Sequence, residues 1–120
     1  MSTAIRLTPT ERLAVRGAIA APIVQVVCDV FGIAETKLRS ESRDAHVSEA
    51  RQAAWYIAHL FSDLSFGEIG MLIGGREKCG VRYGIRRSLE RCHFASKFST
   101  NLKAAIDRLD ASRAKGDAAA

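Results

Sequence analysis

The chain has 120 residues and a mass of 13.1 kDa, which supports one ordinary hydrophobic core but excludes a nucleotide-binding sheet accompanied by a second domain. Apolar residues at 48% and charged residues at 26% are typical of a folded globular domain. The net charge of +5 is concentrated between Arg76 and Arg91, where six basic side chains face two acidic ones, and this favours a polyanionic partner.

The sequence lacks the features of membrane-spanning, secreted, disulfide-rich and metal-binding proteins. No apolar run approaches the ~18 residues of a membrane span, and the first residues lack the apolar stretch of a secretory signal. The three cysteines, Cys28, Cys79 and Cys92, form no C-x-x-C pair. We therefore expect no membrane partner, no disulfide framework and no metal site, and a cytoplasmic protein.

The first half of the chain predicts helices and no strands. Thr8 followed by Pro9 predicts a helix that runs toward Ala20, and Pro22 is expected to break or kink it. A second helix is predicted to follow and to end at Gly32. The polar segment 35–46 is interpreted as a loop. A third helix is expected over 48–61, with a buried stripe of Ala50, Ala53, Ala54, Ile57, Leu60 and Phe61.

The second half begins with a capping box, in which Ser65 and Glu68 predict the start of a short helix and Leu64 is placed to pack on Ile69. That helix is expected to end at the two glycines 74–75. A fifth helix is predicted over 77–91, burying Val81, Ile85, Leu89 and Cys92, and a last one over 96–112, with Leu102, Ile106 and Leu109 inward.

The expected fold is an all-α helical bundle. We expect one domain over residues 22–113, preceded by a helical extension over 1–21 and followed by a disordered tail over 114–120. Segments 65–73 and 77–91 have the order of a helix-turn-helix, in which the second helix enters the major groove. Small residues at 80, 84 and 88 recur on one flank of that helix and indicate close approach of a neighbouring helix or of DNA.

From about Ile23 to Leu109 the chain resembles the C-terminal DNA-binding domain, domain IV, of the chromosomal replication initiator DnaA, a Trp-repressor-like helical fold. The resemblance is carried by 26–33, Ser42-Arg43, 50–58, Asp63-Leu-Ser-Phe-Gly-Glu-Ile-Gly70 and Ile73-Gly-Gly-Arg-Glu77. It implies a helix-turn-helix that binds double-stranded DNA.

The resemblance also implies roles for single positions. Arg43 matches an arginine that enters the minor groove, Arg51 and Gln52 match a pair near phosphates, and His59 matches a basic phosphate contact. Phe66 and Gly67 match a Leu-Pro pair that touches thymine methyl groups. Arg76 matches the arginine after the double glycine, and Glu77, Lys78 and Cys79 fall in the run with which the family reads base edges.

Helical spacing adds further candidates on the predicted helix 77–91. With Val81, Ile85, Leu89 and Cys92 inward, the opposite side, which could face DNA, carries Cys79, Tyr83, Arg86, Arg87 and Glu90.

One departure from the family concerns base reading. The family reads base edges through an Asp-His-Thr-Thr run, which here is Glu77-Lys-Cys-Gly80. Lys78 can donate to guanine, but Cys79 is only a weak donor and Gly80 offers no side chain. Binding is therefore expected to persist with a changed target sequence.

The leading hypothesis is a stand-alone regulator of replication or transcription that binds duplex DNA and associates with the bacterial nucleoid. The alternative is a protein-interaction module that keeps the fold but has lost base reading, with a protein partner in replication or transcription control. No phosphate-binding loop G-x-x-x-x-G-K-[ST] and no catalytic arrangement occurs, so we expect no nucleotide, no cofactor and no enzyme activity, and no ability to melt an origin alone.

Overall fold

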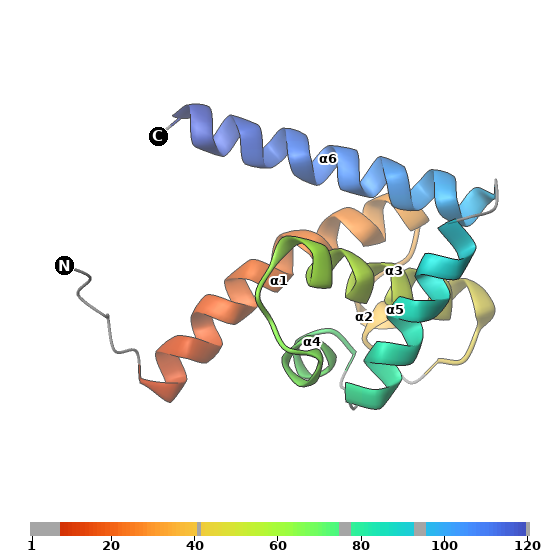
Figure 1. The fold of residues 1–120 in the computed structure, drawn as a ribbon, viewed down its shortest axis with the longest axis horizontal. Helices are drawn as coiled ribbons and strands as arrows, with labels where there is room; N and C mark the ends of the chain where they lie inside the picture. The colour runs from red at the N-terminus through yellow and green to blue at the C-terminus, as the bar shows by residue number, and fades with distance from the viewer. Residues whose placement is uncertain (1–7, 41, 75–77, 93–95, 120) are drawn as a thin grey trace.

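The computed structural model describes residues 8–40, 42–74, 78–92 and 96–119, which form six α-helices and no β-strand (Figure 1). The expected all-α class is confirmed. In chain order the helices are α1 (Pro9–Phe31), α2 (Glu35–Leu38), α3 (Ala45–Phe61), α4 (Phe66–Leu72), α5 (Lys78–Cys92) and α6 (Lys97–Ala119).

Helix α1 begins and ends where the sequence predicts. The Thr8 hydroxyl accepts a hydrogen bond from the Glu11 amide at 3.1 Å, and Gly32 ends the helix in the left-handed conformation with φ 69°. The helix is not divided at Pro22, however, so the prediction of two separate helices is wrong. Ala18 and Pro22 are both exposed, so water can bind the Ala18 carbonyl that a proline four residues later leaves without a partner.

The segment predicted as a loop contains the single turn α2. Its last residue, Leu38, is fully buried and ties the turn to the core. Helix α3 starts at Ala45, three residues earlier than expected, because the Asp44 carboxylate accepts from the His46 amide at 3.0 Å and caps the helix there.

Helix α3 is the centre of the bundle and is contacted by each of the other five helices. Its predicted stripe of alanines and Ile57 is buried, Phe61 is half-buried, and Leu60 is 52% exposed, which corrects the expectation for Leu60. Across one side lie α1 and α6, joined by an edge-on contact between the rings of Phe31 and Phe98 with centroids 6.1 Å apart. Helix α4 and the first half of α5 lie on the side away from α6 (Figure 1).

Helix α6 buries Phe98, Leu102, Ala105 and Leu109, while Ile106 is half-buried. It extends to Ala119 instead of ending near Ser112, so residues 114–119 are helical rather than a disordered tail. The expected boundary at residue 21 likewise falls inside α1.

Candidate nucleic-acid interface

Helix α4 is fixed at its first turn by the predicted capping box. The Ser65 hydroxyl accepts from the Glu68 amide at 3.2 Å, and the Glu68 carboxylate accepts from the Ser65 amide at 3.0 Å. Both Leu64 and Ile69 are buried beside this cap. The two reciprocal bonds satisfy amides that a helix start otherwise leaves open, and they set where the helix begins.

The turn after α4 is anchored on α3. The indole Nε1 of Trp55 donates to the Ile73 carbonyl at 2.7 Å, and both residues are buried. Gly74 follows with φ 92°, a conformation that favours glycine. Trp55 is therefore a core residue, and it holds the turn that precedes α5.

Helix α5 packs on the core through a side that includes two small residues, Gly84 and Ser88. Val81, Gly84, Ile85 and Ser88 are buried, whereas Leu89 is 46% exposed and Cys92 is exposed, so the expected burial of Leu89 and Cys92 is wrong. The helix turns this flank inward because the Trp55 indole lies against Gly84: a Cβ atom there would stand 2.5 Å from Trp55 Cε3. The close approach predicted from small residues is thus made by the neighbouring helix α3 at Gly84, while Ser88 is buried and Gly80 is exposed.

The opposite face of α5 is open to solvent. Cys79, Tyr83, Arg86 and Glu90 are exposed, with Tyr83 at 62%, and Arg87 is half-buried. These are the residues that helical spacing placed opposite the core. Helix α4 and the first half of α5 lie on the side away from α6 (Figure 1), so α6 does not cover the exposed Cys79 and Tyr83.

The arginines of α5 differ in their partners. Arg87 donates to the Glu90 carboxylate at 2.8 Å, one turn along the helix. Arg91 donates to the Gln52 side chain and lies over the Phe98 ring at 5.4 Å. Arg82 lies over the Phe66 ring at 5.9 Å. Within the described residues Arg86 has no hydrogen bond or ion pair, so its charge faces solvent.

Arg51 lies where the resemblance implies a residue near phosphates, but it is only 4% exposed. Its guanidinium donates to three backbone carbonyls, those of Leu38 (3.0 Å), Ser42 (3.3 Å) and Ser40 (2.7 Å). These three hydrogen bonds direct Arg51 at the backbone of Leu38, Ser40 and Ser42, and a phosphate contact by this residue stays a prediction. The arginine supports the loop that carries the exposed Arg43.

Of the other positions that the resemblance implies, the structure describes some and not others. Gln52 is half-buried, His59 and Gly67 are exposed, and Phe66 is half-buried with its ring 5.2 Å from that of His59. Arg76 and Glu77 lie outside the described residues, and of Lys78 only its place as the first residue of α5 is described. The described candidates thus lie on the loop before α3, the end of α3, the start of α4 and the outer face of α5.

Arg82 is missing from the residues predicted from the sequence. Its position three residues after Cys79 and four before Arg86 places it beside the outward face, which was a usable signal. Its contact with Phe66 joins two helices, however, and that contact cannot be deduced from spacing within one helix.

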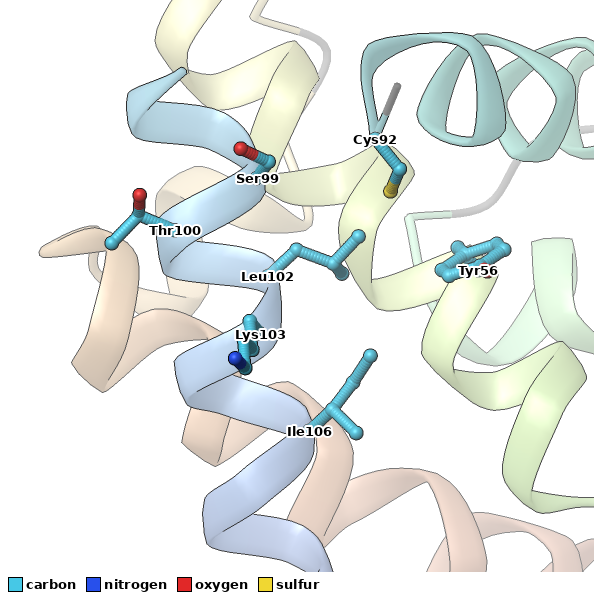
Figure 2. A pocket seen from close by; sticks show the side chains of 7 residues that line it. All are labelled: Tyr56, Cys92, Ser99, Thr100, Leu102, Lys103 and Ile106. Atoms are coloured by element: carbon cyan, nitrogen blue, oxygen red, sulfur yellow. The ribbon is translucent and has the colours of Figure 1, made fainter. Parts of the chain in front are cut away.

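A hollow lies away from this interface, between α3, α5 and α6. It has a volume of about 360 Å³. Figure 2 shows Leu102 and Ile106 directed toward Tyr56 and Cys92. Partial desolvation in this hollow raises the pKa of the Tyr56 phenol, with Cys92 adding to the shift, and partial desolvation also raises the pKa of the thiol of Cys92, although that residue as a whole is exposed. Both groups are therefore neutral at pH 7, and this apolar hollow is distinct from the basic face.

None of the helices in the described ranges is both long and apolar enough to cross a membrane. Across the same ranges, no three His, Cys, Asp or Glu side chains gather in a way that could hold a metal ion.

Comparison with known proteins agrees with the helical arrangement. A family model described as the bacterial DnaA protein helix-turn-helix matches residues 20–87. Relatives include the chromosomal replication initiator protein DnaA of Chloroflexus aurantiacus, 32% identical over 90 residues (75% of this chain, 19% of the relative), and that of Trichormus variabilis, 32% identical over 105 residues (88% and 22%). The DnaA of Gloeobacter violaceus is 36% identical over 63 residues (52% and 14%). The chain therefore spans between 14% and 22% of the length of these relatives.

Proposed function

The chain belongs to the family of the bacterial DnaA helix-turn-helix, and we propose that it binds double-stranded DNA through α4 and α5. The observation that carries this proposal is the outer face of α5, where Tyr83, Arg86 and Arg87 lie on the side away from the core. A helix-turn-helix presents its second helix to the major groove in this way.

The supporting contacts are proposed for the surrounding elements. Arg43 extends from the loop that Arg51 holds, and it is the candidate for the minor groove. Phe66 and Gly67, at the start of α4, and His59, at the end of α3, flank the same face of the molecule. Arg76, Glu77, Lys78 and Cys79 at the turn and the start of α5 complete the proposed interface.

The finer role that we propose is regulation of replication or transcription by occupation of DNA sites, in association with the bacterial nucleoid. This role requires only the proposed binding of duplex DNA. The alternative, a protein-interaction module without base reading, predicts weak binding to any duplex.

Titration of the chain against random-sequence duplexes at several salt concentrations tests the proposal. If Arg43, Arg76, Arg86 and Arg87 neutralise phosphates, the slope of log K against log salt should be about −3 to −4. Sub-micromolar binding at low salt with such a slope supports duplex binding. A slope shallower than about −2 favours the protein-interaction module.

A matched pair of variants controls for the general effect of charge. Arg86→Ala removes a cation from the proposed interface, and it should weaken binding to all duplexes and reduce the slope by about one. Arg108→Ala removes an exposed cation from α6, where Arg108 pairs with Asp29 at 3.5 Å. It should leave binding nearly unchanged. Equal losses in both variants would show that the chain attracts DNA through its net charge rather than through α5.

A further inference from the structure

Three side chains from consecutive helices meet where α4 and α5 adjoin. The half-buried Phe66 ring lies 5.2 Å from the His59 ring, at an interplanar angle of 33°. The Arg82 guanidinium lies over the same Phe66 ring, with Cζ 5.9 Å from its centre. Both His59 and Arg82 are exposed, so the cluster presents a cation resting on an aromatic ring beside the outward face of α5.

We propose that Arg82 is a specificity-determining residue that reads a guanine in the bound DNA, and that Phe66 holds its guanidinium in place for that contact. The inference rests on the proposed duplex binding and adds a base-reading group to it. In the first turn of α5, Cys79 is only a weak donor and Gly80 has no side chain.

The location of Arg82 suits contact with a base. It is the fifth residue of α5, within the first two turns, which is the part of the second helix that approaches base edges in a helix-turn-helix. Its neighbours on the helix surface, Cys79 and Arg86, are both exposed. A side chain at this position thus lies between the start of α4 and the outer face of α5.

The donors of Arg82 are available for a ligand. Within the described part of the chain, no carboxylate or carbonyl accepts a hydrogen bond from it, whereas Arg87 is bound to Glu90 and Arg91 to Gln52. Stacking uses the flat face of a guanidinium and leaves its N–H groups free at the edge. That edge matches the O6 and N7 acceptors of guanine, the pairing that arginine makes most often in the major groove.

The ring beneath the guanidinium gives Arg82 an advantage over Arg86. A free arginine side chain loses rotamer freedom when it binds DNA. An arginine that is already stacked on an aromatic ring has lost part of that freedom before binding. Replacing Phe66 by leucine keeps an apolar side chain but removes the ring. Phe66→Leu is therefore expected to weaken the same base contact without removing the charge.

The experiment begins with selection of bound sites from random duplexes by the full chain. Each G·C pair of the selected site is then replaced by A·T, and affinities are measured for the natural chain and for Arg82→Ala, Arg82→Lys, Phe66→Leu and Arg86→Ala. The natural chain should lose about 5- to 150-fold at one G·C pair, the range of one good base contact. Arg82→Ala should abolish that preference, and Arg82→Lys and Phe66→Leu should reduce it.

Controls separate the possible outcomes. Arg82 is exposed, so thermal unfolding of Arg82→Ala should match that of the natural chain. Arg86→Ala should weaken binding to all duplexes equally and keep the guanine preference. If Arg82→Ala instead weakens all duplexes by one factor, Arg82 contacts phosphate and the inference is wrong. If the chain binds duplexes with steep salt dependence but selects no guanine, only this inference fails. If it binds no duplex, the proposed function fails as well.

Discussion

Gly84 of α5 lies so close to Trp55 of α3 that a Cβ atom at residue 84 would stand 2.5 Å from Cε3 and 2.7 Å from Cζ3 of the indole. The indole cannot move away freely, because its Nε1 donates to the Ile73 carbonyl in the turn before α5. One tryptophan therefore determines both how closely α5 packs on α3 and where the turn that leads into α5 is held.

The first prediction concerns Gly84→Ala. Alanine favours a helix over glycine by ~1 kcal/mol. The clash with Trp55 should cost more than this gain, since overpacking a core costs ~1–3 kcal/mol. We expect a net loss of about 1 kcal/mol in the free energy of unfolding, measured by urea denaturation, together with weaker DNA binding. Gly17→Ala is the matched control: a Cβ atom added there would meet nothing within 4 Å outside its own stretch of helix, so the change should be neutral or stabilising.

The second prediction concerns the capping box. Ser65→Ala removes the acceptor for the Glu68 amide and should lower the free energy of unfolding by ~1 kcal/mol. Because α4 supports α5, DNA affinity should fall as well. Thr8→Ala removes the equivalent cap of α1, far along the chain from α4 and α5, and should lower stability without lowering DNA affinity. If both variants reduce DNA affinity equally, α4 has no special part in binding.

The third prediction separates two arginines on neighbouring segments. Arg51→Met leaves the carbonyls of Leu38, Ser40 and Ser42 without their donor, and it should cost about 3 kcal/mol of stability. Arg43→Ala changes an exposed side chain, so stability should stay within about 0.5 kcal/mol while DNA affinity falls. Thermal unfolding and duplex titration of both variants check this. A stable Arg51→Met protein with weakened DNA binding would show that Arg51 contacts DNA rather than supporting the fold.

Local signals in the sequence predicted those helix boundaries that a cap or a glycine marks. The caps at Thr8 and Ser65 and the stop at Gly32 each depend on a few adjacent residues, and each is found in the structure. Helix α2 escaped prediction because four residues are too few to show a period. Its stability comes from burial of Leu38 and from the distant Arg51, whose guanidinium binds the Leu38 carbonyl.

Contacts between distant segments were harder to predict. The periodicity of α5 admitted either Leu89 or Ser88 as an inward residue, and the nearby Trp55 decides for the small-residue flank. The same applies to the site. The outward positions of Tyr83 and Arg86 follow from one helix, but the burial of Arg51 and the contact of Arg82 with Phe66 depend on how helices pack.

The last prediction concerns specificity. The resemblance assigns base reading in the family to an Asp-His-Thr-Thr run, and this chain has Glu77-Lys-Cys-Gly80 there. Each good base-edge contact contributes about 1–3 kcal/mol of discrimination. We therefore expect the chain to prefer the DNA box of the replication initiator over scrambled DNA by less than about tenfold, or ~1.4 kcal/mol, in competition titrations. Replacing the four residues by Asp, His, Thr and Thr should raise that preference, because Cys79 and Gly80 are exposed and the new side chains need not displace core residues. Strong preference in the natural chain would show that reading does not depend on this run. No gain in a folded fourfold variant would show that α5 lies differently on the DNA.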